Sequence, residues 1–350
     1  MARIFSRTAD DLPAKGRSWF WVLLLPSPFV IAIVGISALG FYWDSEPDLF
    51  KVKTVATDMV GGDASKLVPG SVTTATLIHV VTVLLDKPGG YLSNDVMPPS
   101  VLMDNIPTWE QGVLQQIRDL ARVLRNDLSR SQTQSSEDAD LSVADPRFHF
   151  DPYSWQIPSA EGEYRVGLDR LKRYLARLQD PARGAKFYAR ADNLREWLRL
   201  VGTRLGDLAQ RLSASVGQVA LDTSTGRGTA TPGTATQGPD TDAVQRLAIR
   251  TPWLQLDDVL YDARGAAWAI LHFLRAAQID FEQVLRDKNA QVSLRQVIRE
   301  LEQTQTPVWS PVILNGTGFG LLANHSLVMA SYISRANAAL IDLQMLLVQG

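Results

Sequence analysis

The chain has 350 residues with no cysteine, and 35 lysine and arginine residues against 37 aspartate and glutamate residues give it a net charge of −2. The absence of cysteine excludes thiolate zinc sites, thiol nucleophiles and disulfide bonds. The nearly balanced charge argues against a nucleic-acid partner, and the length allows one large domain or two ordinary ones.

The first predicted element is a transmembrane helix over residues 19–43, which contain no charged side chain. A helix needs about 20 apolar residues to cross the hydrocarbon core of a bilayer. Aromatic side chains near both ends suit the headgroup level and form a predicted membrane belt of Trp19, Trp21, Tyr42 and Trp43. A cleaved signal peptide is the alternative, but its apolar core would span only about 7–15 residues.

Charges on the two sides of this segment predict its orientation. The basic residues that precede it are Arg3, Arg7, Lys15 and Arg17, and the acidic residues that follow it are Asp44, Glu46 and Asp48. The positive-inside rule therefore places residues 1–18 in the cytoplasm and the bulk of the chain outside it. Such a short tail has no room for a signalling module, so a ligand-binding sensor would need a partner to pass its signal inward.

Beyond the predicted anchor the sequence is mostly helical. Residues 72–86 are strongly apolar, and residues 87–100 are rich in turn-forming residues. Five later segments repeat apolar residues in alternating steps of 4 and 3, beginning at Val113, Tyr164, Leu194, Leu260 and Met329. This heptad spacing is typical of coiled-coil-like helices that pack along their length. The expected fold is all-α: an N-terminal transmembrane helix followed by an extracytoplasmic antiparallel helical bundle.

Two stretches are too polar to predict as folded. Residues 129–146 are short and hydrophilic, and residues 222–242 consist mainly of Thr, Gly, Ser, Ala and Pro. Such a composition buries too little apolar surface to offset the entropy of ordering. We interpret residues 222–242 as a flexible linker between an N-terminal helical half, 44–221, and a C-terminal half, 243–350. Whether the halves pack as one body stays open.

Two motifs carry a resemblance to a known family. The first is the stretch from Leu84 to Gln132, which begins LLDKPGGYLSNDVMPPS, and the second is FYARADNLREWL from Phe187 to Leu198. Both resemble a family of proteobacterial single-pass inner-membrane proteins described as a domain of unknown function. The resemblance implies an anchor in the bacterial inner membrane and a periplasmic C-terminal domain. It implies no catalytic residue and no cofactor.

The stretch most like a functional site lies between Trp309 and Ser326. Its glycines alternate beside polar residues, and its candidate interaction residues are Asn315, Gly316, Gly318, Gly320 and His325. A phosphate loop would usually include a lysine, which this stretch lacks. The two remaining interpretations are a tight loop before the last helix and a groove for an extended peptide or glycan. A second candidate loop contains Asn94 and Asp95, which also suit an ordinary turn.

Neither a catalytic centre nor a metal or cofactor site is predicted. None of the four histidines has another at i+3 or i+4, so no helix presents two histidine ligands. The arginine-rich helix from Glu163 is interpreted as a solvated face, with acidic polymers or headgroups as the alternative ligand. We therefore expect a non-catalytic envelope scaffold with an envelope-protein partner and the lipid bilayer as second partner through residues 19–43. The alternative is a cell-envelope enzyme acting on peptidoglycan.

Overall fold

The computed structural model describes residues 28–131, 136–180, 182, 184–216, 218–220, 247–249, 251–308, 313 and 323–349. Most of these residues are helical, which confirms the all-α part of the expected fold. In chain order the α-helices are α2 (Pro28–Trp43), α3 (Val52–Met59), α4 (Ser71–Asp86), α5 (Asn105–Val123), α6 (Leu141–Phe148), α7 (Ala160–Leu178), α8 (Ala191–Ser213), α9 (Leu256–Asp280), α10 (Glu282–Asp287), α11 (Gln291–Gln303) and α12 (His325–Gln349).

Short elements connect these helices. Three-residue 3₁₀ turns lie at Ala64–Lys66, Ser100–Leu102, Ala214–Val216 and Trp253–Gln255, and α5 ends in a π-turn at Leu124–Leu128. Strands β1 (Gln218–Ala220) and β2 (Leu247–Ile249) form an antiparallel pair in which Val219 is opposite Ala248. Three residues are too few to show the alternation that identifies a strand, so the sequence did not predict this pair.

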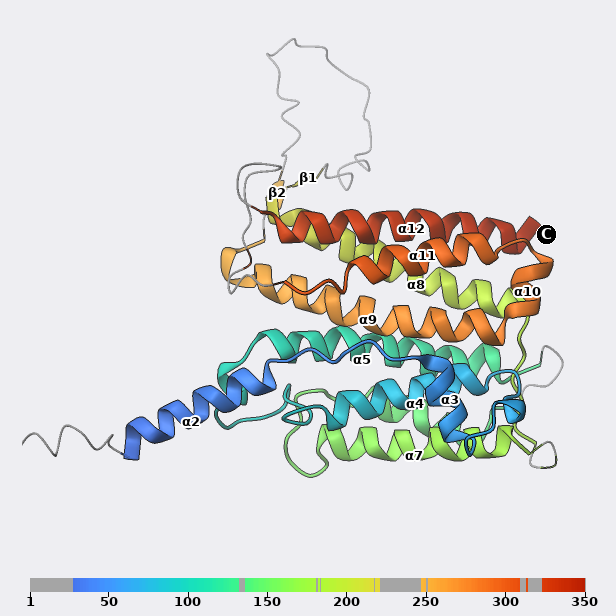
Figure 1. Cartoon of the computed structure of the whole chain (residues 1–350), viewed down its shortest axis with the longest axis horizontal. Helices are drawn as coiled ribbons and strands as arrows, with labels where there is room; N and C mark the ends of the chain where they lie inside the picture. The colour runs from blue at the N-terminus through green and yellow to red at the C-terminus, as the bar shows by residue number, and fades with distance from the viewer. Residues whose placement is uncertain are drawn as a thin grey trace, which may run out of the picture.

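The long helices lie side by side along the long axis of the molecule (Figure 1). Helices α12, α11 and α8 lie toward one side, α9 and α5 in the middle, and α4 and α7 toward the other side. Most neighbours are antiparallel, as expected, but α5 and α9 begin at the same end, where Thr108 and Asp258 approach to 3.4 Å. Three helices separate α5 from α9 along the chain, so no short loop imposes an antiparallel arrangement on this pair.

The heptad positions form the core. In α5 and the turn that follows it, the five predicted positions are all buried: Val113, Ile117, Leu120, Leu124 and Leu128. The same holds for the predicted positions of α7, α8 and α12. These residues belong to one hydrophobic cluster that includes side chains from both sides of the predicted linker. The described helices of the two predicted halves therefore share a core, while the linker itself, 222–242, lies outside the described residues.

Helices α5 and α9 cross at two glycines. A Cβ atom at Gly112 would lie 2.2 Å from the carbonyl oxygen of Asp262, and one at Gly265 would lie 2.1 Å from that of Trp109. Only a residue without a side chain permits two helix backbones to approach so closely. The crossing also brings the indole rings of Trp109 and Trp268 to a centroid separation of 5.3 Å.

Residues 136–146 differ from the sequence-based expectation. The stretch 129–146 was expected to be unfolded, yet α6 begins within it and buries Leu141, Ala144 and Phe148. Its acidic residues form ion pairs with arginines elsewhere in the chain, such as Asp145 with Arg125. The expectation failed because a count of apolar residues does not include such pairings.

Helix α2 stands apart from the bundle (Figure 1). Its 16 residues carry no charge, and none of them is buried. Among the described residues, no helix combines the length and the apolarity needed to cross a membrane. Residues 19–27 of the predicted span, including Trp19 and Trp21, lie outside the described residues.

Candidate functional site

The chain that leaves α2 is bound along one face of α9. We call residues 45–51, which have no regular secondary structure, the strap. Alternate strap residues Glu46, Asp48 and Phe50 bond to Arg264, Trp268 and His272, which are spaced four residues apart on α9. Two residues of extended chain advance by about 6.6 Å and four residues of α-helix by about 6 Å. The two repeats therefore stay in register over three successive residue pairs.

Arg264 joins three elements. Its Nε and Nη2 donate to the two carboxylate oxygens of Glu46 at 2.7 and 2.6 Å, a bidentate geometry. Its Nη1 donates to the carbonyl oxygens of Thr304 and Thr306, just after α11. The Arg264 side chain is only 8% exposed. Because a buried guanidinium without partners is costly, these bonds fix the strap, α9 and the end of α11 relative to one another.

His272 ends this series of contacts. Its Nε2 accepts a bond from the Phe50 backbone N–H at 3.1 Å, and its Nδ1 donates to the carbonyl of Trp268 at 2.7 Å. The Phe50 ring stacks on the imidazole at a centroid distance of 3.8 Å. Burial lowers the pKa of His272 to about 3, so the ring is neutral near pH 7 and is able to accept the Phe50 bond.

The C-terminal end of α2 lies against the loop between α4 and α5. The Trp43 ring occupies the space where a Cβ atom of Gly89 would stand, at 2.8 Å, and Gly89 has a φ of +85° that favours glycine. One turn earlier, a Cβ atom at Gly40 would lie 3.2 Å from Cβ of Pro99. The loop therefore runs beside the last turn of α2 (Figure 1).

A buried ion pair holds this loop in place. Lys87 Nζ lies 2.5 Å from Glu110 Oε1, and both side chains are almost completely buried. The carboxylate also accepts the backbone N–H bonds of Leu92 and Ser93, each at 2.8 Å. Burial raises the pKa of Glu110, while Lys87, the Ser93 hydroxyl and the Leu92 N–H lower it. The fold thus accepts a costly buried charge pair at the point where the loop turns.

Asn94 and Asp95, the predicted interaction residues of this loop, both form bonds within the chain. The Asn94 amide is buried and donates to the carbonyl of Ser154 at 2.8 Å and to Glu161 at 2.9 Å. Asp95 accepts from the Ser100 hydroxyl at 2.7 Å. Asn94 therefore ties the loop to residues 151–158. A role of Asn94 and Asp95 toward a partner stays a prediction.

Of the other predicted site residues, only some lie in the part of the chain that the structure describes. Asn315, Gly316, Gly318 and Gly320 lie outside the described residues. His325 is the first residue of α12 and is partly buried. The hypothesis of a peptidoglycan enzyme depends on this stretch and stays a prediction. Of the belt, Trp43 packs on Gly89 and Tyr42 is exposed.

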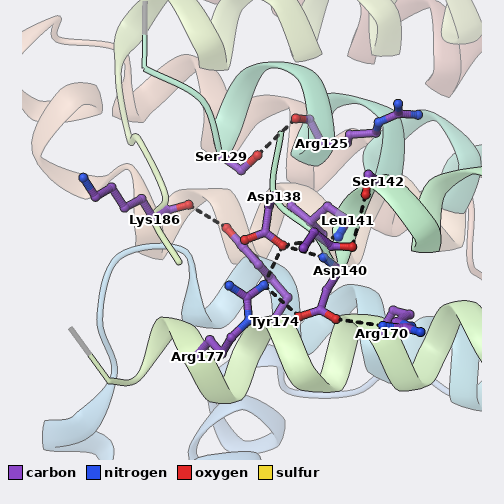
Figure 2. A network of polar contacts seen from close by, with 11 residues as sticks. Arg125, Ser129, Asp138, Asp140, Leu141, Ser142, Arg170, Tyr174, Arg177 and Lys186 are labelled. Carbon is purple, nitrogen blue, oxygen red and sulfur yellow. Dashed lines mark hydrogen bonds and ion pairs between the residues drawn. The ribbon is translucent and has the colours of Figure 1, made fainter. Parts of the chain in front are cut away.

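The arginines of α7 are largely occupied by acidic partners. Arg177 donates to Asp140 and Asp138 at 2.9 and 2.6 Å, and Arg170 approaches Asp140 at 3.4 Å (Figure 2). Between them, the Tyr174 hydroxyl donates to the carbonyl of Lys186 at 2.8 Å (Figure 2). This part of α7 therefore holds the segment before α6 in place. Within the described residues, no three histidine, aspartate or glutamate side chains are grouped as a metal site.

Residues 13–350 match a family described as an uncharacterized protein conserved in bacteria, DUF2333. The chain belongs to the DUF2333 family. No curated protein and no solved structure matches it. The DUF2333 match includes α2, the strap and every described helix after them. It confirms the bacterial family expected from the sequence, while the proteobacterial and single-pass membrane parts of that expectation stay predictions.

The strap is the feature that sequence reasoning missed. Residues 51–70 show little periodicity and were interpreted as a loop or a short helix leaving the membrane, and the acidic residues of 44–48 served only to predict orientation. A signal was nevertheless present in α9, where Arg264, Trp268 and His272 recur every four residues within the otherwise apolar stretch 263–274. Polar side chains in such a stripe need partners, and an extended segment supplies them at matching spacing.

Proposed function

We propose that this DUF2333 protein is a membrane-anchored, non-catalytic scaffold of the bacterial envelope. In this proposal residues 19–43 span the inner membrane, residues 1–18 are cytoplasmic, and the bundle is periplasmic and holds other envelope components. The observation that carries the proposal is α2 itself, an uncharged helix with no buried residue that continues N-terminally into further uncharged sequence. An apolar surface of this kind needs a nonaqueous environment.

The strap supports this function physically. A scaffold must hold its folded body at a defined position relative to its anchor. Bonds to three residues of α9 and the contacts of Gly40 and Trp43 leave little free chain between α2 and the core. A protein that needed a freely moving domain would be served better by a flexible linker at this point.

Topology is tested with reporters fused after Gly350 in the full chain. Alkaline phosphatase, which works only outside the cytoplasm, should be active, and a cytoplasmic fluorescent reporter should be dark. The chain should stay in the membrane after carbonate washing and keep its N-terminal residues. A reporter active only in the cytoplasm, or a mature chain that begins after residue 43, would overturn the anchor.

The scaffold role is tested by photocrosslinking in living cells. Helix α12 has exposed apolar side chains at Ile341, Met345 and Val348, which follow each other on one helical face. A crosslinking amino acid at Ile341 or Met345 should give a discrete adduct with an envelope component, whereas the same probe at the exposed Arg173 of α7 should not. The absence of an adduct from either α12 position would argue against a scaffold that acts through this face.

A further inference from the structure

Exposed apolar side chains gather in two loops at the end of the bundle where α2 emerges. Met97 and Leu102 in the first loop are 72% and 76% exposed, and Ile157 in the second loop is fully exposed. We use the name apolar collar for Met97, Val101, Leu102, Tyr153, Trp155 and Ile157. Single exposed apolar residues are common on protein surfaces, but a group on neighbouring loops indicates a binding surface.

The collar is held in position by polar bonds beneath it. Asn94 joins the first loop to Ser154 in the second at 2.8 Å. The Tyr153 hydroxyl accepts from Gln111 on α5 at 2.7 Å. The buried Glu110 bonds to the backbone of the first loop. The loops therefore present their apolar side chains outward from a fixed base.

The position of α2 sets the depth of the collar. Pro99, between Met97 and Val101, lies against Gly40, and Gly40 precedes Trp43 by three residues of helix. At about 1.5 Å per residue, the Gly40–Pro99 contact lies about 4.5 Å from Trp43 toward the N-terminus of α2, which is the side of the proposed membrane interior. If Trp43 lies at the headgroup level, the first loop reaches at least that level too.

We propose that the apolar collar inserts into the outer, periplasmic headgroup region of the same bilayer that α2 spans, as a second membrane contact. This inference depends on the proposed function, because it requires α2 to be in the membrane. The exposed charges around the collar are acidic and include Asp44, Asp95, Asp104 and Asp151. Apolar insertion, rather than attraction to anionic lipids, therefore drives the contact, and zwitterionic lipids are sufficient for it.

Two contacts with one bilayer would determine the tilt of the bundle. Helix α2 alone fixes a point of attachment and leaves the tilt of the bundle relative to the membrane plane free. The collar removes this freedom, because it lies to one side of α2 and is joined rigidly to the core.

The absence of native cysteine allows a direct test in the full chain. Single variants Met97→Cys, Leu102→Cys and Ile157→Cys are labelled with a nitroxide and placed in phosphatidylcholine nanodiscs. Collision rates with oxygen, which concentrates in lipid, are compared with those for a water-soluble nickel chelate. The control is Val292→Cys, 63% exposed near the start of α11, at the end of the bundle away from α2 (Figure 1).

We expect the ratio of oxygen to nickel collisions at the three collar positions to exceed that at Val292 at least severalfold. Equal ratios at collar and control would overturn the inference, as would protection from both reagents, which would indicate a protein partner. Val34→Cys on α2 reports on the proposed function separately. If Val34 is exposed to lipid and the collar positions are exposed to water, only the second membrane contact is refuted. If Val34 is exposed to water, the membrane span is refuted, and the inference with it.

Discussion

Arg264 and Glu46 are 218 positions apart in the sequence, yet they form a bidentate ion pair with distances of 2.7 and 2.6 Å. Glu46 lies only three residues beyond the end of α2, and Arg264 lies in the helix at the centre of the core. The pair therefore connects the predicted anchor directly to the interior of the bundle. It gives the strap a role that is measurable as folding stability.

Glu46→Gln should destabilise the bundle by about 1–3 kcal/mol, because it leaves the buried Arg264 guanidinium without a counter-charge. The free energy of unfolding is measured by urea titration of the full chain in mild detergent, followed by circular dichroism. The matched control is Glu196→Gln, since Glu196 pairs with Arg199 on the exposed surface of α8. That change should cost no more than about 0.5 kcal/mol. Equal losses in the two variants would contradict the role assigned to the strap.

Stability should decrease in acid through His272. Its pKa is about 3 in the folded chain against 6.5 for the ordinary side chain, so the folded state binds the proton less readily than the unfolded state. The contribution is therefore fully present above about pH 6.5 and is lost as pH falls toward 3, by up to about 1.4 kcal/mol per pH unit.

The variant His272→Gln keeps an acceptor for the Phe50 N–H bond but does not titrate. Between pH 6.5 and 4, its unfolding free energy should fall less steeply than that of the native chain. The neighbouring His79 and Arg275 are present in both proteins, so the difference isolates His272. If the unfolding free energies of the native chain and the variant fell equally with pH, the His272 imidazole would not have the lowered pKa that its burial requires.

Gly265→Ala should destabilise the chain by about 1–3 kcal/mol or more, because its new methyl group would overlap the backbone of α5. The matched control is Gly206→Ala in α8, where the nearest atom to a new Cβ is 3.8 Å away. There the higher helix propensity of alanine should stabilise by about 0.5–1 kcal/mol. Thermal unfolding of both variants gives the sign of each effect, and a neutral Gly265→Ala would contradict the close crossing.

Glu110→Gln should cost about 3–5 kcal/mol, since it leaves Lys87 buried without its partner. The double variant Lys87→Met/Glu110→Gln removes both charges and should be less destabilised than the single one. A double-mutant cycle measured by urea unfolding gives the coupling energy between the two side chains. Additive losses would show that the two groups do not depend on each other.

Cutting the predicted linker should not separate the halves. A protease site placed within residues 222–242 gives two fragments, whose described helices meet at α5–α9 and α8–α12. The fragments should elute together from a sizing column in mild detergent and separate only in denaturant. Separation without denaturant would show that the shared core is too weak to hold them.

Much of the fold was predictable because its core follows one periodicity. Leucines spaced by 4 and 3 in α7, α8 and α12 are buried where the heptad requires. The parallel placement of α5 and α9 was not predictable in this way. Three helices separate the two along the chain, so no short loop sets their direction. Their close crossing depends on Gly112 and Gly265, whose missing side chains show no periodicity and become informative only when the two backbones are seen together.

The candidate site was less predictable than the core. Asn94 was identified as a polar loop residue, but its partners Ser154 and Glu161 are about 60 positions further along the chain. The same applies to Glu46 and Arg264. Local sequence reveals that a buried polar group needs a partner, but it does not reveal which of many distant groups supplies one.

The arrangement of the strap has a mechanical consequence. Its bonds to three positions on α9 lie side by side along one line, so a pull on α2 along that line would load them together in shear. A connection that peeled would instead break one bond at a time. Force applied at the N-terminal helix would thus be shared among Arg264, Trp268 and His272 and enter the bundle through its central helix.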